Sequence, residues 1–598
     1  MKKQTILAGI LSLSLVASIF AHDLFPRTVG FFLGPNSATT QVGAYDVANS
    51  AVERNTVIAT RPPSRQGGLT VIIDANTEYQ TIDGFGTSER TFDDPHLSGR
   101  IDPVTGRAMV VVPAADQEQI LNALYLPSQL GLTRVRPVNP DTADPDSTGV
   151  RTPIEPVNDN NDPYVTDLTK FNFEWKALDD HCHYINRARQ FGRGVNTYFL
   201  SPLNRERWMS VDPANPNNAA EYAEWMLAQV QRCRQLGVDF PYLSIANEPS
   251  YFRNEISAEF VRDVIKNLGP RLRSAGFPTT KFVVNDDIRS TDSARQIRII
   301  MADPVARSFV GALGTHLYDE SEFNPTIIRQ VPDLGAQYGL PVWMTEYTSG
   351  ALGGDGFRWG ELMHQLLTNN FSAIDYLWAY SGEGFAGQYV AIQRNGNFQY
   401  TGYAPTKPYY VTGQYSKFVR PGSKRISAVP AISSNVRTSA YKQGAQIIIV
   451  AQNINSFATV VTFNGLSGIS SVQPTRTSVT ENWASLPGIA VNGGEFAATL
   501  PPSSVTTFVS NTPAADATVS GRVLTPDGRS LRNIIVSLMD SAGVSRTATT
   551  SSFGFYSFDS VRTGETYTIT AASRRYRFTP RILVINGSIA NLDLLGLE

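Results

Sequence analysis

The chain has 598 residues, of which 42% are hydrophobic and 17% charged, and its formal net charge is −2. This length exceeds what one hydrophobic core organises, and the composition is that of a globular protein with several domains rather than a disordered or fibrous one. The near-neutral charge argues against a strong field that would attract nucleic acid or an anionic membrane, so we expect a neutral partner.

The N-terminal residues match a secretory signal at positions 1–21. Met1-Lys2-Lys3 precedes an apolar run from Ile6 to Phe20, and we expect cleavage near Ala21. An uncleaved membrane anchor is the alternative, because Ile19 is large for a cleavage-site position. Residues 22–68 are expected to form an irregular leader, since prolines and small polar residues dominate there. The sequence therefore predicts a secreted protein, extracellular or periplasmic, which meets a membrane only through an uncleaved leader.

Residues 69–403 alternate eight times between short apolar runs and longer segments of helical spacing. Apolar strands joined by helices indicate a parallel sheet covered on both faces. A (β/α)8 TIM barrel of the α/β class is the simplest closure, and a doubly wound open sheet is the alternative. The expected strands are Gln80–Gly84, Leu132–Val138, Gly194–Leu200, Tyr242–Ala246, Lys281–Asn285, Ala312–His316, Val342–Thr345 and Ile374–Trp378.

Beyond the barrel, short strands separated by Gly, Ser, Asn and Pro predict two all-β units. Residues 404–510 are expected to form a β-sandwich at the side of the barrel. A linker at 511–515 leads to a second, smaller β-sandwich at 516–598.

Two cysteines, Cys182 and Cys233, fall on the apolar faces of two expected helices. They form a disulfide after export or remain two buried thiols, and the sequence leaves both open. His181 and His183 flank Cys182 but point to different sides of its helix, so no metal site is expected there.

Two glutamates end barrel strands. Glu248 follows the fourth expected strand and Glu346 the seventh. Because the C-terminal ends of barrel strands share one face, both carboxyl groups are expected in one cleft. Glycosidic bond cleavage needs such a pair, one group as acid and one as carboxylate on the other face of the sugar. The charge of Glu346 is expected to raise the pKa of Glu248 and keep that acid protonated.

The strings around these glutamates resemble those of clan A glycoside hydrolases, and more narrowly of the retaining enzymes of glycoside hydrolase family 30. The C-terminal unit, with Gly521 and Gly554-Phe555-Tyr556, resembles carboxypeptidase regulatory-like β-sandwiches. The family 30 likeness rests on Ser244–Pro249, Trp343–Glu346, Gln80–Gly86, Ser201-Pro202 with Trp208-Met209, Tyr409-Tyr410 with Gln414–Gly422, and Leu500–Phe508.

The resemblance implies Glu248 as acid/base and Glu346 as nucleophile. It implies further that Asn247 bonds the sugar 2-hydroxyl, that Tyr318 donates to Glu346, and that Arg134 holds Glu346 ionised by its charge. Arg136 is the alternative to Arg134 for holding Glu346 ionised. The substrate-binding residues expected in full are Asn247, Trp378, Tyr318, Arg134, His316 and Trp208. Trp378 offers a face for sugar stacking, whereas Asp286 and Asp287 are interpreted as solvated loop charges outside the site.

The resemblance narrows the substrate to a β-linked polysaccharide. Family members that need a glucuronic acid branch carry an Arg- and Tyr-rich loop after the eighth strand, whereas Tyr380–Tyr389 holds no Arg. An endo-β-1,4-xylanase without glucuronate dependence is therefore expected. The alternatives are an endo-β-1,6-glucanase or β-1,6-galactanase, an exo-acting glycosidase, and a non-catalytic carbohydrate-binding surface protein.

No cofactor or metal is expected, because a metal-dependent hydrolase needs His and Asp clusters at strand ends and His316 is the sole histidine at an expected one. The expected partner is a polysaccharide, with no nucleic acid, and the protein is expected to act as a monomer.

Overall fold

The computed structural model describes residues 69–89, 92, 112–139, 154–155, 157–173, 177–202, 209, 218–250, 256–318, 323–352, 354–382, 387–396, 399–433, 435–511, 516–540, 543–562, 565–585 and 588–597. The expected signal and leader lie outside them. Among these residues no helix is both long and apolar enough to cross a membrane.

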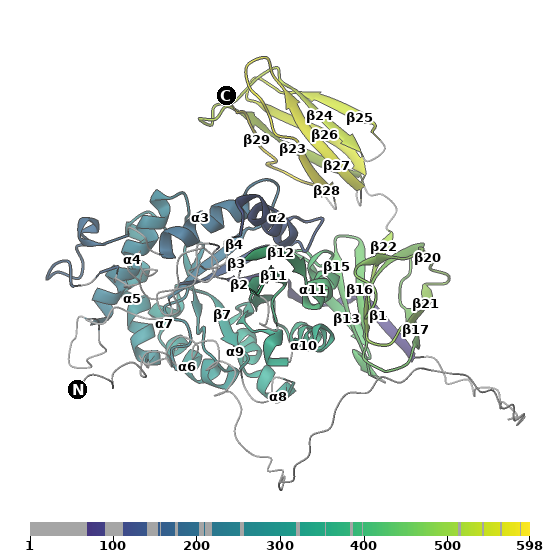
Figure 1. Ribbon diagram of the computed structural model, residues 1–598, viewed down its shortest axis with the longest axis horizontal. Helices are drawn as coiled ribbons and strands as arrows, with labels where there is room; N and C mark the ends of the chain where they lie inside the picture. Colours follow the sequence, from purple (N-terminus) through teal and green to yellow (C-terminus); the bar gives the residue numbers. More distant parts are fainter. Residues whose placement is uncertain are drawn as a thin grey trace, which may run out of the picture. The chain divides into compact units, whose positions relative to one another are not determined.

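Eight parallel strands close into a barrel, which confirms the expected (β/α)8 fold (Figure 1). Trp343, Phe199 and Val283 pack in its interior as part of one buried layer. The barrel strands are β2 (Gly84–Glu89), β3 (Arg134–Asn139), β4 (Thr197–Pro202), β5 (Tyr242–Leu243), β6 (Lys281–Val284), β7 (Val310–His316), β8 (Val342–Glu346) and β9 (Ala373–Leu377).

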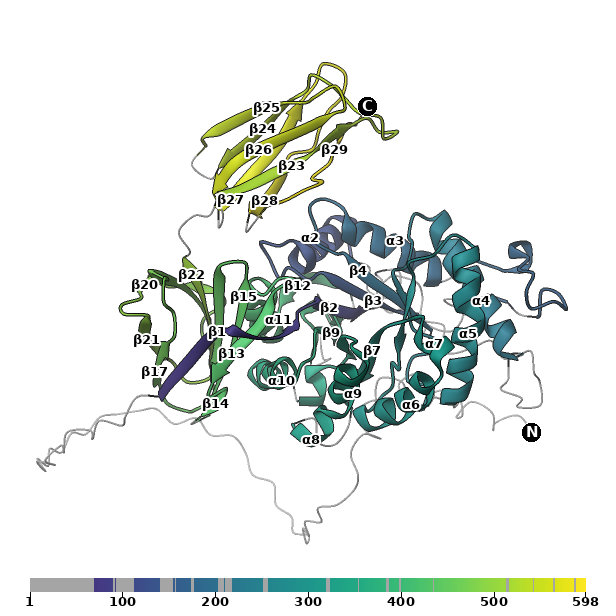
Figure 2. The same ribbon diagram turned by 180° about the vertical axis from the view of Figure 1, so that it is seen from behind.

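Helices surround the barrel, and their sequences explain where they start (Figure 2). Ser257 accepts a hydrogen bond from the Phe260 amide and so caps α5, which buries one apolar stripe. Asp355 caps α10 in the same way. The helices are α2 (Ala114–Tyr125), α3 (Ala177–Arg189), α4 (Asn218–Gln235), α5 (Ala258–Ser274), α6 (Ser290–Ala302), α7 (Pro304–Arg307), α8 (Pro325–Ile328), α9 (Gln330–Tyr338), α10 (Gly356–Thr368) and α11 (Lys407–Ser416), with 3-10 turns η1 (Leu168–Lys170) and η2 (Ser349–Leu352).

A disulfide joins Cys182 of α3 to Cys233 of α4, with 5.8 Å between the two Cα atoms. Of the two alternatives that the sequence left open, the structure shows the bonded one. The bond links two neighbouring helices of the barrel.

The first barrel strand differs from the expected one. Residues 80–83 were expected to begin it, but Gln80 and Thr81 end β1 (Leu69–Thr81), which pairs antiparallel with β13 (Lys424–Val429) in the side sheet. The apolar run is thus divided between two sheets, and the barrel starts only at Gly84. The chain passes through the side sheet before and after the barrel.

The side sheet has eleven strands, of which β1 is one, and polar contacts fix it to the barrel. Arg437 pairs with Glu361 of α10 at 2.6 Å, and Gln452 donates to the Phe357 carbonyl at 2.6 Å. Its other strands are β14 (Ile432–Ser433), β15 (Val436–Gln443), β16 (Gln446–Asn453), β17 (Thr459–Asn464), β18 (Ser471–Thr477), β19 (Ala484–Ser485), β20 (Ile489–Ala490), β21 (Glu495–Leu500) and β22 (Ser504–Asn511). A separate three-stranded sheet holds β10 (Tyr380–Gly382), β11 (Val390–Arg394) and β12 (Tyr400–Pro405).

The C-terminal region forms a second β-sandwich. Its two sheets enclose a core that includes Val519, Val536, Phe558 and Ile569. The strands are β23 (Asp516–Leu524), β24 (Ile535–Asp540), β25 (Ser545–Thr549), β26 (Phe555–Arg562), β27 (Glu565–Ala572), β28 (Arg581–Ile585) and β29 (Leu594–Leu595).

Candidate active site

Consecutive barrel strands deliver polar side chains to one buried cluster at their C-terminal ends, where barrel enzymes place their chemistry. All of these residues are at most 9% exposed. They are Ser88 on β2, Arg136 on β3, Ser201 on β4, Asn247 and Glu248 after β5, Asp286 after β6, His316 on β7, Tyr318 after β7, and Glu346 on β8.

Glu248 uses one carboxyl oxygen inside the protein and leaves the other without a partner. Its Oε1 lies 2.9 Å from Nδ1 of His316, whereas Oε2 is buried and has no hydrogen-bond partner among the described residues. The residue has φ 46°, a conformation that side chains rarely adopt and that is concentrated at functional sites. The backbone amide of Glu248 donates to the Asp286 carbonyl at 2.8 Å and holds this turn.

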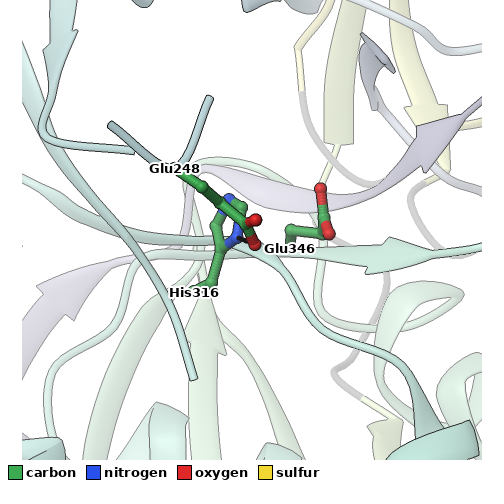
Figure 3. A group of neighbouring side chains, drawn as sticks. All are labelled: Glu248, His316 and Glu346. Atoms are coloured by element: carbon green, nitrogen blue, oxygen red, sulfur yellow. Dashed lines mark hydrogen bonds and ion pairs between the residues drawn. The ribbon is translucent and has the colours of Figure 1, made fainter. Parts of the chain in front are cut away.

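Glu346 accepts hydrogen bonds at both oxygens. Arg136 Nη1 donates to Oε2 at 2.8 Å, with Ser88 Oγ at 3.4 Å, and the Tyr318 hydroxyl donates to Oε1 at 3.2 Å. Figure 3 shows the Glu248 carboxyl group against the His316 ring, with Glu346 beside them. One carboxylate oxygen of each glutamate and one nitrogen of His316 lie within 4.8 Å of one another.

Asp286 connects the two cationic side chains of the cluster. Arg136 donates to its Oδ2 at 2.8 Å, and His316 Nε2 lies 3.2 Å from its Oδ1. Ser201 also donates to Oδ2. The interpretation of Asp286 and Asp287 as solvated loop charges is therefore wrong, since both are 0% exposed.

Burial and charge set the protonation of this cluster. Burial opposes a charge on His316, but the charge of Glu346 and the bonds to Asp286 and Glu248 raise the pKa of His316 to about 10. Burial also opposes a charge on Asp286, yet Arg136 and His316 hold its pKa well below the usual range. His316 is thus a cation at neutral pH, and both ring nitrogens donate.

The pKa of Glu248 is raised, as expected, but the main cause differs. Burial is the largest cause, and the charge of Glu346 adds to it, while the His316 bond and the Arg136 charge act in the opposite direction. Burial also raises the pKa of Tyr318 well above its usual value, which keeps the hydroxyl a hydrogen-bond donor.

Arg134 was expected to hold Glu346, and this is corrected by the structure. Arg134 forms two 2.9 Å hydrogen bonds with Asp375 on β9 and lies over the Trp343 ring. Residues two apart on a strand share a face, so Arg134 and Arg136 both point into the barrel but at different depths. The deeper Arg134 meets Asp375, and Arg136 reaches Glu346.

Three further residues, Asn247, Trp378 and Trp208, were expected to bind substrate. Asn247 accepts a hydrogen bond from Arg136 at Oδ1, which turns its amide donor Nδ2 away from that side chain. Trp378 follows β9 and is partly buried. Trp208 lies outside the described residues.

Glu248, His316 and Glu346 are metal-ligand types whose ligand atoms lie within 4.8 Å of one another. These atoms are already engaged with protein groups, because Arg136 pairs with Glu346 at 2.8 Å and His316 Nδ1 lies 2.9 Å from Glu248 Oε1. These residues are better suited to holding and moving protons.

Sequence reasoning named Arg136 only as the alternative to Arg134, set Asp286 aside as a solvated loop charge, and did not place Ser88 or Ser201 in the cluster. Asp286 directly follows the run that ends at Asn285, the same strand-end position that singled out Glu248 and Glu346. The strand-end position thus pointed to Asp286, and what the sequence did not show was its burial. Ser201 stood out only within the Ser201-Pro202 string of the resemblance, and Ser88 carried no comparable signal.

The chain resembles known proteins in sequence and in fold. The glucuronoxylanase XynC of Bacillus subtilis (strain 168) is 29% identical over 330 residues, which cover 52% of this chain and 71% of that protein. The structure resembles the glycoside hydrolase family 30 subfamily 8 xylanase Xyn30A from Clostridium acetobutylicum, with 23% identity, a TM-score of 0.54, and 74% of this chain and 100% of that one covered. It also resembles the endo-β1,6-glucanase BT3312, with 17% identity, a TM-score of 0.55, and coverage of 74% and 94%.

The C-terminal sandwich matches a family model at residues 518–594, described as a carboxypeptidase regulatory-like domain. This confirms the expected nature of that unit. By sequence the chain is thus similar to a glucuronoxylanase, by fold it resembles xylanases of glycoside hydrolase family 30, and residues 518–594 form a carboxypeptidase regulatory-like domain.

Proposed function

We propose that the chain hydrolyses β-glycosidic bonds of a polysaccharide by double displacement, with Glu346 as nucleophile and Glu248 as acid/base. The observation that carries this is the distance within the pair, since oxygens of the two carboxyl groups lie within 4.8 Å. Retaining glycosidases separate these groups by about 5 Å, whereas inverting enzymes leave roughly 6.5–9.5 Å for a water molecule.

In the first step, Glu346 attacks the anomeric carbon while Glu248 protonates the leaving oxygen. His316 donates to Oε1 of Glu248, so the acid proton resides on Oε2, the oxygen without a protein partner. The Glu346–carbon bond forms as the glycosidic carbon–oxygen bond breaks, and the leaving sugar departs with that proton.

Charge compensation explains how Glu248 then becomes a base. Before reaction, the cations Arg136 and His316 offset the anions Glu346 and Asp286, and Glu248 is neutral. Glu346 loses its charge when it becomes an ester. The pKa of Glu248, which that charge helps to raise, then falls, so Glu248 can take a proton from the attacking water.

A β-1,4-xylan without required glucuronate branches is the proposed substrate. The likeness to a glucuronoxylanase supports xylan, and the lack of Arg in Tyr380–Tyr389 supports independence from the acidic branch. The fold likeness to an endo-β1,6-glucanase supports β-1,6-glucan as the second candidate. Asn247 is proposed to bond the sugar 2-hydroxyl, and Trp378 and Trp208 to contact sugar rings.

The setting of the reaction is proposed from the sequence. The signal-like residues 1–21 support export, and a net charge of −2 suits a neutral polysaccharide rather than nucleic acid or a membrane. The protein is proposed to act as a monomer.

The test is release of reducing ends from glucuronoxylan, unbranched β-1,4-xylan, β-1,6-glucan and β-1,6-galactan by wild type and by Glu346→Gln. Wild type should cleave both xylans at similar rates, and the variant should be slower by about 10⁴-fold or more. NMR of the first product should show retained anomeric configuration. Equal release by both proteins would remove Glu346 from the mechanism, and an inverted product would contradict double displacement.

A further inference from the structure

Asp287 is a buried carboxylate beside the active-site cluster that the proposed reaction does not use. It follows Asp286 in the connection between β6 and α6 and is 0% exposed. Within the described part of the chain, its side chain forms no hydrogen bond with Glu248, His316 or Glu346. A buried carboxylate is costly unless donors surround it, so its partners show what it does.

The side chain of Asp287 accepts four hydrogen bonds, two at each oxygen. The backbone amides of Ser250 and Ile288 donate to Oδ1 at 3.2 and 2.9 Å. The Ser250 hydroxyl and Gln296 Nε2 donate to Oδ2 at 2.6 and 2.9 Å. One carboxylate thus joins three segments, which are the turn after β5, the connection after β6, and α6 with Gln296.

Ser250 belongs to the turn that carries Glu248. Glu248 has φ 46°, a strained backbone conformation that persists only where the surrounding structure enforces it. Its amide donates to the Asp286 carbonyl at 2.8 Å, and two residues later Ser250 bonds Asp287 through its amide and its hydroxyl. Three hydrogen bonds therefore hold this turn against the end of β6, and the Asp287 side chain accepts two of them.

The backbone of Asp287 also holds the residue that bonds Glu248. The His316 amide donates to the Asp287 carbonyl at 2.8 Å, and His316 Nδ1 lies 2.9 Å from Glu248 Oε1. The network is anchored on α6, because Asn285 Nδ2 donates to Gln296 Oε1 at 2.9 Å and so turns the Gln296 amide nitrogen toward Asp287. Asp287 is thus bonded to the segments of both Glu248 and His316.

We propose that Asp287, together with Ser250, is a positioning residue that holds the Glu248 carboxyl group in place for proton transfer. This inference rests on the proposed function, because it concerns the acid/base of that reaction. A displacement of about 1 Å in a reacting group can lower a rate about 100-fold. Loss of the Asp287 bonds should therefore weaken the steps in which Glu248 gives or takes a proton, and should leave the attack by Glu346 nearly intact.

Leaving groups of different basicity separate these two tasks. A departing sugar needs the proton of Glu248, whereas 2,4-dinitrophenolate is stable enough to leave without one. The experiment measures kcat/KM, which reports the first displacement, on unbranched β-1,4-xylan and on 2,4-dinitrophenyl β-xylobioside. Asp287→Ala should lower kcat/KM about 30- to 100-fold on xylan and by less than about threefold on the aryl glycoside. If wild type cleaves β-1,6-glucan instead, that glucan and 2,4-dinitrophenyl β-gentiobioside replace the pair.

Ser250 supplies a milder test that does not depend on how well Asp287→Ala folds. Ser250→Ala removes one of the four hydrogen bonds to Asp287, so kcat/KM on the glycan should fall about 3- to 10-fold with little change on the aryl glycoside. Ser250→Thr keeps a hydroxyl group and should lose less than Ser250→Ala on the glycan.

Asp303→Ala is the matched control for a general loss of stability. Asp303 accepts the amides of Val305 and Ala306 at 2.8 and 3.0 Å and caps α7, before β7 and therefore at the N-terminal end of the barrel strands. Its loss should lower the Tm and leave the ratio of the two kcat/KM values, glycan over aryl glycoside, at the wild-type value.

The ratio of the two kcat/KM values decides the outcome. An equal loss on both substrates in Asp287→Ala, or a wild-type ratio in both Asp287→Ala and Ser250→Ala, would overturn the positioning role and leave the proposed function standing. The proposed function fails by a different result, namely no cleavage of any glycan by wild type or full activity of Glu346→Gln on the aryl glycoside. In that case the positioning role falls with it.

Discussion

The molecule buries carboxylates in two places and treats them differently. In the active-site cluster, Arg136 and His316 offset Asp286 and Glu346 through contacts of 2.8–3.2 Å, and a single acid oxygen, Oε2 of Glu248, is left for the substrate. On α4, Glu224 is buried and forms no ion pair within the described part of the chain, and burial raises its pKa to about 7. The first arrangement offsets its anions with cations, whereas the second favours the neutral form of its acid.

Removing Arg136 should have the largest effect in this comparison. In Arg136→Met, Glu346 and Asp286 lose their shared cation in a buried site, so kcat/KM on the cleaved glycan should fall about 10²- to 10³-fold. The free energy of unfolding should fall by roughly 3–5 kcal/mol, because breaking a buried pair leaves charge uncompensated. Steady-state kinetics and urea unfolding measure the two effects.

Arg134→Met is the matched control. Arg134 has the same chemistry on the same strand but pairs with Asp375 rather than with a catalytic carboxylate. Its loss should lower stability by a similar amount while it changes kcat/KM at least tenfold less than Arg136→Met does. Equal loss of activity in the two variants would mean that the contact with Glu346 is not what matters.

Asp286→Asn tests how the charge of Asp286 acts on His316. Asp286 helps to raise the pKa of His316 to about 10, and the neutral amide removes that contribution. Loss of a hydrogen bond between charged groups is worth about 1.5–3 kcal/mol, so kcat/KM at pH 7 should fall about 10- to 100-fold. Because the His316 cation is the active form, the alkaline limb of the pH–rate profile should move to lower pH.

The same substitution should change the pH dependence of stability. The pKa of His316 is raised in the folded state, so its contribution is fully present below the unfolded value near 6.5 and is lost as pH rises toward 10. Wild-type unfolding free energy should therefore decline over this window, and Asp286→Asn should show a smaller decline. If the pH–rate profile and the decline of the unfolding free energy with pH are both the same as in wild type, Asp286 does not control the protonation of His316.

The strand-end rule explains how much of this cluster the sequence predicts. Eight apolar runs predicted the barrel, and residues directly after those runs included Glu248 and Glu346. The rule does not give depth along a strand, and so it did not decide between Arg134 and Arg136, which share a face. It also did not show that Gln80 and Thr81, the start of the first expected strand, belong to β1 of the side sheet. The pairing of β1 with β13 joins residues that are far apart in the sequence. Burial of Asp286 likewise depends on contacts from three other strands.

The smallest expected effect concerns the second place. At pH 8, above the Glu224 pKa of about 7, Glu224→Gln removes a buried charge that no ion pair offsets among the described residues, and it keeps the shape of the side chain. Replacing such a charge by a neutral group is expected to raise the free energy of unfolding by about 1 kcal/mol, in contrast to Arg136→Met. Urea unfolding at pH 8 measures this change, and activity should stay within twofold of wild type. A clear loss of stability would show that protein groups already compensate Glu224, and the difference between the two buried sites would then disappear.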